Sequence, residues 1–249
     1  RIFVDSVLNS PNSKWKKEYL KIYLEYLSSG LNDEVAKLNS LNSLLSIPVD
    51  MYTEEQLSFV ISYSIEACKE ESYSIRLMAV QFLYKAVRSI KITGESLNSL
   101  NNIIWEFSKD EGLCINYLKY KIAQNINAPK NLLKEYSTLL LGDWYKTSDI
   151  FLNNLKAATP WNVKTISIDY IMENLSHKNE LALLQTATHL ANLVKVSAKE
   201  SVRNKAGNSL VELGHMLTID QRNEIAFELI KGLEIDEMQY AKYIPEYLG

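Results

Sequence analysis

The feature that most constrains the fold of this chain is a short residue pattern that recurs about every forty positions. Each clear copy places a β-branched residue, a basic residue, a small residue and an aliphatic residue at relative positions 1, 2, 5 and 9; the copies begin at Ile75, Val163 and Val202. This spacing puts positions 1, 5 and 9 on one face of an α-helix. A fixed period of this length is typical of helical solenoids, which stack pairs of helices.

Apolar residues with helical spacing follow one another along the chain, separated by short polar breaks. No sustained alternation of apolar and polar residues predicts a sheet, so the sequence predicts an all-α protein. Thr53 with Gln56 and Thr218 with Gln221 have the spacing of capping boxes at helix starts. The expected helices cover roughly residues 13–28, 33–46, 54–70, 73–90, 95–108, 112–126, 129–141, 148–158, 161–175, 178–195, 198–216, 219–232 and 236–248.

Extending the pattern along the chain shows how the expected helices pair. Each copy opens the second helix of a pair. The copies begin at Val35, Ile75, Ile115, Val163, Val202 and, loosely, Tyr240, so that successive copies are 40, 40, 48, 39 and 38 residues apart. In this pattern the chain resembles the HEAT-repeat family. The resemblance implies a right-handed α-α superhelix of about six helix pairs, with residues 1–249 forming a single repeat domain. The copies at Val35 and Ile115 depart from it, because Asn39 and Lys119 stand where a small residue is expected.

The 48-residue step indicates an irregular insertion near residues 127–160. It contains Trp144 and Tyr145 beside a Gly-Asp turn. Insertions in solenoids often map to a binding face, so these rings are candidate partner-binding anchors. The alternative is that they cap the core where the superhelix changes curvature.

Basic residues recur at or near the second place of the pattern, at Lys37, Arg76, Lys164 and Arg203. The resemblance implies that second helices line a concave side, where stacking would align these cations with a rise of roughly 10 Å per unit. Such a ladder suits an acidic peptide or a phosphate backbone. The alternative is structural: each base pairs with a carboxylate of the adjacent unit and buries its aliphatic stem between repeats.

Composition limits the class of partner and the compartment. The net charge of −3 and the pI of about 5.8 disfavour a general nucleic-acid binder. No apolar run reaches the roughly 18 residues that a membrane span needs. Cys68 and Cys114 lie in apolar helical patterns and are expected to be reduced core residues, which favours the cytoplasm. The chain begins with Arg1 and lacks an initiator Met, which suggests a piece of a longer protein.

No catalytic, metal-binding or cofactor-binding motif appears in the sequence. His177, His189 and His215 form no His-x-x-x-His pair, and no Cys-x-x-Cys or phosphate-binding glycine loop occurs. Some HEAT-like proteins are DNA glycosylases that use Trp and Asp residues on a concave basic face. The candidates here are Trp15, Trp105, Trp144 and Trp161, with Asp110 a little more than one helical turn beyond Trp105. We therefore expect no cofactor and no enzyme activity from this chain.

These features together predict a non-catalytic scaffold or adaptor that presents a concave helical surface to a protein or peptide. The first alternative is a nucleic-acid-binding or DNA-repair module of the same fold. The second is a regulatory domain of a larger multidomain enzyme. A resemblance at the level of the fold does not choose among them.

Overall fold

The computed structural model describes residues 13–28, 33–90, 92–106, 111–156, 158–175, 180–234 and 244–247. Within these ranges all regular secondary structure is helical, which confirms the predicted all-α class. No helix in the described ranges is long and apolar enough to cross a membrane. The contacts between residues divide the chain into two compact units, Arg1–Gly142 and Asp143–Gly249.

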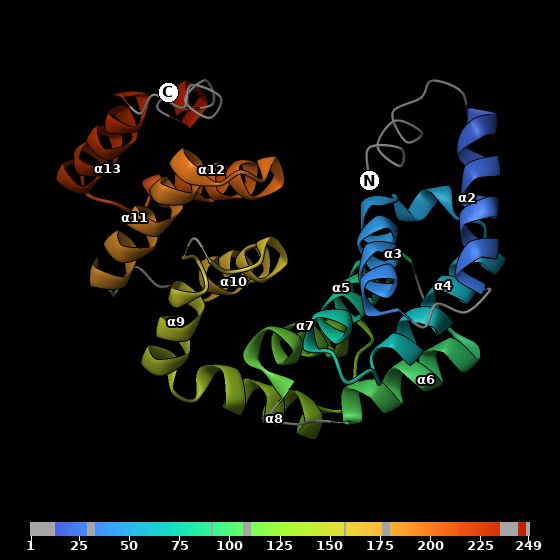
Figure 1. The fold of residues 1–249 in the computed structure, drawn as a ribbon. Helices are drawn as coiled ribbons and strands as arrows, with labels where there is room; N and C mark the ends of the chain where they lie inside the picture. The colour runs from blue at the N-terminus through green and yellow to red at the C-terminus, as the bar shows by residue number, and fades with distance from the viewer. Residues whose placement is uncertain are drawn as a thin grey trace. The chain divides into compact units, whose positions relative to one another are not determined.

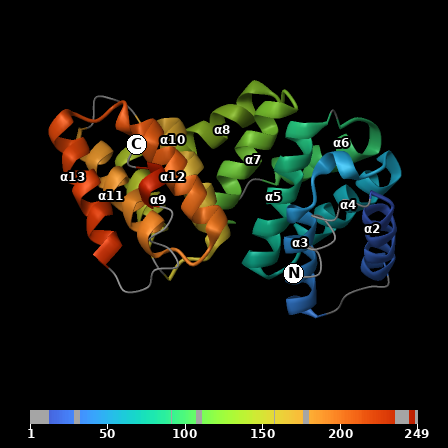
Figure 2. The same ribbon diagram turned by 90° about the horizontal axis from the view of Figure 1, so that it is seen from above.

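The first unit arranges its helices in two layers. Its second helices α3, α5 and α7 lie side by side, α4 packs on α5, α6 packs on α7, and α4 lies beside α6 (Figures 1 and 2). The elements of this unit are α2 (Ser13–Ser28), α3 (Glu34–Ser46), the 3-10 helix η1 (Val49–Met51), α4 (Glu54–Ala67), α5 (Tyr73–Ser89), α6 (Gly94–Trp105), α7 (Leu113–Asn125) and α8 (Lys130–Leu141).

The second unit has the same kind of layering. Here α10 lies beside α12, α11 lies beside α13, and α11 also packs against α12, while α9 packs on α10 (Figures 1 and 2). Its elements are α9 (Trp144–Asn153), α10 (Trp161–Asn174), α11 (Glu180–Val196), α12 (Glu200–Gly214), α13 (Ile219–Lys231), and the 3-10 helices η3 (Gly232–Glu234) and η4 (Ile244–Tyr247).

The three clear copies of the repeated pattern lie on the buried faces of α5, α10 and α12. In every copy the β-branched, small and aliphatic positions are all buried, and the small residues Ala79, Ser167 and Ala206 are each 0% exposed. A small side chain at these positions lets the neighbouring helix approach closely. The predicted helical face is therefore confirmed for these three helices.

The register predicted for the copy in α3 is wrong by one residue. Val35 is 62% exposed, whereas Ser40 and Leu44 are 4% and 0% exposed. A copy that begins at Ala36 has the standard spacing, with the base Lys37 in second place. The burial of a helical face depends on a rotation of about 100° per residue, so a shift of one residue moves the pattern off the core.

Helix starts follow the predicted capping chemistry. Thr53 with Gln56 and Thr218 with Gln221 form complete capping boxes at α4 and α13. The helix expected over residues 148–158 instead begins at Trp144, because the side chain of Asp143 accepts a hydrogen bond from the Lys146 amide at 3.2 Å. Most of the helix expected over residues 236–248 lies outside the described residues.

The 48 residues between the pattern copies at Ile115 and Val163 include two helices between the second helices of successive pairs, whereas the corresponding shorter segments include one. Between the second helices α7 and α10 the chain forms both α8, which packs on α7, and α9, which packs on α10. Only Gly142 and Asp143 separate α8 from α9, and the boundary between the two units falls between these residues. The extra residues of the insertion are thus used to build an additional helix.

The two cysteines form no disulfide, in agreement with the predicted reduced state. Cys114 is buried and Cys68 is partly exposed. Burial raises the pKa of the Cys68 thiol to about 12, so this thiol is protonated at neutral pH and is a poor nucleophile.

Candidate binding pocket

Two of the four predicted ladder residues hold loops of their own helix pairs. The Nη1 atom of Arg76 donates to the carbonyl of Glu70 at 2.8 Å, and that of Arg203 donates to the carbonyl of Ser197 at 2.7 Å. Each carbonyl lies six residues before its arginine, in the loop between the first and second helices of a pair. These arginines therefore fix the loops from which their own helices start.

The lysines of the first unit make comparable contacts. Lys37 forms an ion pair with Glu70, in the loop after α4. Lys119 occupies the small-residue position of α7, is 2% exposed, and donates to Glu111 Oε2 at 2.6 Å and to the Glu106 carbonyl at 3.2 Å. The long side chain thus fills the space between helices, while its ammonium group lies against the loop before α7.

Trp144 and Tyr145 have different environments. The ring of Trp144 stacks on that of Tyr170, with centroids 6.0 Å apart, and Tyr170 stacks in turn on Phe151. Tyr145 is 74% exposed at the start of α9. The Trp144 ring therefore packs at the edge of the core, and the Tyr145 ring is exposed to solvent.

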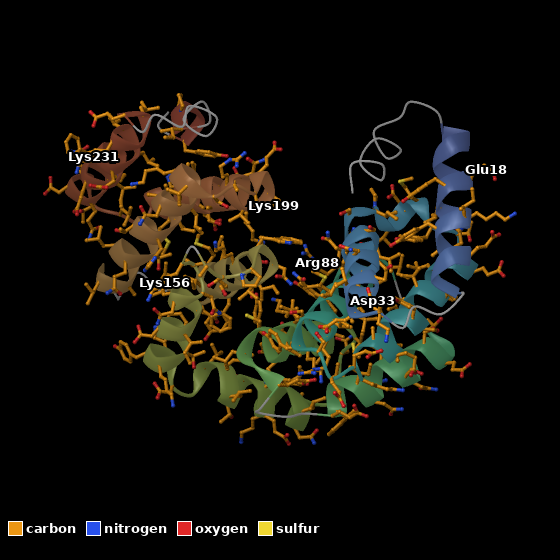
Figure 3. The ribbon with its side chains drawn as sticks, in the orientation of Figure 1. Glu18, Asp33, Arg88, Lys156, Lys199 and Lys231 are labelled. Carbon is orange, nitrogen blue, oxygen red and sulfur yellow. The ribbon has the colours of Figure 1, made fainter. Side chains whose placement is uncertain are left out.

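Lys164 lines a pocket of about 570 Å³ in the second unit. The bases lining this pocket come from four segments: Lys156 after α9, Lys164 in the first turn of α10, His189 in α11, and Lys199 before α12. Lys156 and Lys199 are labelled in Figure 3. Apolar walls are supplied by Leu155, Trp161, Leu193 and Val196. A volume of this size is in the range of ordinary ligand sites.

The pocket carries an excess of positive charge. None of its described lining residues is a carboxylate, and Glu200, the exposed first residue of α12, does not line it. Burial lowers the pKa of Lys164. Burial and the nearby Lys156 cation lower the pKa of His189, so its imidazole is neutral at neutral pH. Lysines are therefore the charged residues among the described lining of the pocket.

An aromatic ring holds one of these ammonium groups. Lys199 Nζ lies 4.9 Å from the centroid of the Trp161 ring. A cation–π contact of this kind contributes about 0.5–1 kcal/mol at an exposed site. The indole thus orients Lys199, for which no ion pair with a carboxylate is found among the described residues.

Two helix N-termini add to the positive potential. The first residues of α10 and the residue before α12 line the pocket, and neither Pro160 nor Lys199, which precede these helices, caps its helix with a side-chain hydrogen bond. Free amides and the helix dipole favour anions at such ends. The C-terminal end of α11 also lies here, and carbonyl groups at such an end carry partial negative charge. Two carbonyls in this region are already hydrogen-bonded: Leu193 O accepts from the Ser197 amide, and Ser197 O accepts from Arg203.

The sequence identified only part of this pocket. Lys164 was predicted as a binding residue, and Arg203 holds the loop that carries Ser197 and Lys199. Lys156 and Lys199 were missed, because residues more than forty positions apart in sequence give no local sign that they meet. The sequence feature that could have indicated the pocket is the presence of lysines and Trp161 near the starts of α10 and α12.

The other candidate chemistry does not assemble in the described part of the chain. Trp105 is 45% exposed at the end of α6, while Asp110 and His177 lie outside the described residues. His215 is exposed at the end of α12. The described ranges contain no cluster of three or more His, Cys, Asp or Glu residues that could hold a metal ion.

Comparison with known proteins identifies no relative: no protein-family model matches the chain, and no curated protein is significantly similar. Function is therefore inferred from the residues and their geometry.

Proposed function

We propose that this chain is a non-catalytic HEAT-like module of about six helix pairs that binds a protein partner through the pocket at the starts of α10 and α12. The observation that carries the proposal is a cavity with three lysines, an indole and apolar walls, and with no carboxylate among its described lining residues. The repeat spacing and the two-layered packing within each unit support the HEAT-like architecture.

The chemistry of the pocket favours binding over catalysis. Ammonium groups attract an anion, and apolar walls bury the carbon atoms that carry it. An acidic segment of a partner protein matches this combination.

A protein partner fits better than a nucleic-acid backbone. Arg76, Arg203 and Lys37 make contacts within the fold, so three of the four residues of the predicted ladder are already engaged. A duplex backbone needs cations spread over many phosphates, and the chain has a net charge of −3.

Binding of defined probes tests the proposal. We expect the chain to bind fluorescent acidic peptides, and the Lys156→Gln/Lys199→Gln double variant to bind them at least about tenfold more weakly. Lys146→Gln, an exposed lysine of α9 that does not line the pocket, is the matched control.

Duplex DNA is the competing probe. If DNA bound more tightly than every peptide, with a logarithmic salt slope of about −0.9 per phosphate contact, the protein-binding proposal would be wrong. Failure of every peptide to bind the wild-type chain would also overturn it.

A further inference from the structure

The side of α13 that faces away from α11 carries a concentration of exposed apolar side chains. Ile219, Phe227 and Ile230 are 69%, 60% and 46% exposed, and Leu233, in the 3-10 helix that continues α13, is 45% exposed. A rotation of about 100° per residue puts positions 219, 227 and 230 within about 80° of one another. Contiguous exposed apolar patches of this kind mark sites of contact with another molecule.

The packing within the second unit uses only the other side of α13. Ile225 and Leu229, on the inner side of the helix, are 5% and 2% exposed. Glu228 reaches α11, where it pairs with Lys195 at 3.5 Å. Among the described helices of this unit α13 is the outermost (Figures 1 and 2). Its apolar outer side is therefore left exposed by the fold of the unit itself.

We infer that this outer side of α13 is the contact surface for a second copy of the chain. The α13 helices of the two copies pack antiparallel about a two-fold axis at Ala226. None of the residues of α13 lines the pocket at the starts of α10 and α12, so this is a second interaction site, independent of the proposed function.

The order of residues along α13 suits such a pair. Ile219 of one copy lies opposite Leu233 of the other, because both are seven residues from Ala226. The small side chain of Ala226, which is partly exposed, lets the two helices approach closely at the axis. Phe227 lies beside the axis. The polar and exposed Asn223 also lies on this side of the helix, which limits the strength of the contact.

The charges beside the apolar residues favour a second copy over a partner of one charge. Asp220 and Glu224 in the first half of α13 and Lys231 in its second half lie within about 40° of one another, on one border of the apolar side. In an antiparallel pair the two borders run beside each other in opposite directions, so each Lys231 lies near the Asp220 and Glu224 of the other copy. In a parallel pair like charges would be opposite each other. The surface is thus complementary to itself in the antiparallel arrangement.

Lys231 keeps the capacity for such an ion pair. Its ammonium group pairs with Glu228 at 2.8 Å and lies 4.8 Å from the centroid of the Phe227 ring. The side chains of this ion pair are 50% and 37% exposed, and an ammonium group has three hydrogen atoms to donate. Lys231, labelled in Figure 3, can therefore donate to a carboxylate of the second copy without giving up Glu228.

Sedimentation of the chain at increasing concentration tests for the dimer. The weight-average mass should rise from 28.5 kDa towards twice that value. Because the contact consists of one short helix from each copy, it belongs with weak interfaces, and we expect a dissociation constant on the order of 10–100 μM. A mass that stays at 28.5 kDa up to about 1 mM would overturn the inference.

Two matched substitutions locate the contact. Phe227→Glu places a charge within the apolar side of α13 and should weaken the dimer at least about tenfold. Val211→Glu changes a 48% exposed apolar residue of α12, outside this surface, and should leave the dissociation constant within about twofold of the wild-type value. Circular dichroism checks that both variants stay helical. An unchanged dimer in Phe227→Glu, or equal weakening by both variants, would overturn the inference.

Charge exchange at low salt tests the antiparallel pairing. Lys231→Glu and Asp220→Lys each place like charges opposite each other in their own dimers, and each should weaken the dimer several-fold. A mixture of the two variants restores opposite charges at both symmetry-related positions, so the mixed dimer should be tighter than either variant alone. No gain in the mixture would overturn the antiparallel contact. The substituted residues do not line the pocket, so loss of the dimer would leave the binding of acidic peptides unchanged.

Discussion

Individual glycines in α12 have different roles. A Cβ atom at Gly207 would overlap the ring of Tyr247, whereas a Cβ at Gly214 would meet no atom within 4 Å. Tyr247 belongs to η4, in which Ile244 is 1% exposed. Gly207 is therefore needed for η4 to lie on α12, and Gly214 only ends the helix.

This contrast predicts opposite effects of the same substitution. Gly214→Ala should raise the free energy of unfolding by about 0.5–1 kcal/mol, because alanine loses less backbone entropy on folding. Gly207→Ala should lower it by about 1–2 kcal/mol, since Tyr247 must move from its place on α12. Urea denaturation of both variants checks this, and a similar stabilisation by both would contradict the contact with Tyr247.

Lys164 gives a prediction about pH. Burial lowers its pKa in the folded state below the ordinary value of 10.5, so between these two values the unfolded chain binds more protons than the folded chain. The wild-type protein should therefore gain stability relative to Lys164→Met as the pH rises towards 10.5. Urea midpoints of the two proteins at several pH values measure the difference. A difference that stayed constant or decreased with pH would contradict the burial of a charged lysine.

At the scale of helices and loops, a recurring arginine joins the two helices of a pair. Arg76 and Arg203 occupy the same place in their pattern copies and bind carbonyls at the same separation of six residues. In α7 the equivalent place is Asn116, and Lys119, one turn later, contacts the preceding loop instead. A contact with the preceding loop is therefore present in α7 as well, but a residue at a different position of the pattern makes it.

Removing one of these arginines should loosen its loop. Arg203→Met is expected to lower the free energy of unfolding by about 1–3 kcal/mol, because the Ser197 carbonyl loses a charged donor at a buried position. Hydrogen exchange should increase in residues 197–203. Arg222→Met, which changes an exposed arginine of α13, is the control and should have an effect within about 0.5 kcal/mol. Equal effects of the two changes would show that the loop contact adds no stability.

At the scale of the whole molecule, the contacts cluster within two units, residues 1–142 and 143–249. Ala79 lies in the buried face of α5 in the first unit, and Ala206 lies in that of α12 in the second. In arrays of repeats, stability depends mainly on contacts between neighbours, so damage to one repeat stays largely local.

Matched overpacking substitutions test this locality. Ala79→Leu and Ala206→Leu should each cost about 1–3 kcal/mol, because a larger side chain has no space between packed helices. Hydrogen exchange should increase most within the unit that carries the substitution. Equal loosening of both units by either variant would indicate that the chain unfolds as one cooperative body.

The sequence by itself determined the all-α class, most helix boundaries and the buried faces of α5, α10 and α12, because these depend on spacing and capping within a few residues. It misplaced the register of α3 by one residue, because a rotation of about 100° per residue determines which face is buried. It misplaced the start of α9 by four residues, because the Asp143 cap determines where that helix begins. Only the tertiary structure decided that Arg76 and Arg203 hold loops and that Trp144 packs on Tyr170. It also brought Lys156 and Lys199 together in one pocket, because electrostatic surroundings are set by chain segments that are distant in sequence and adjacent only after folding.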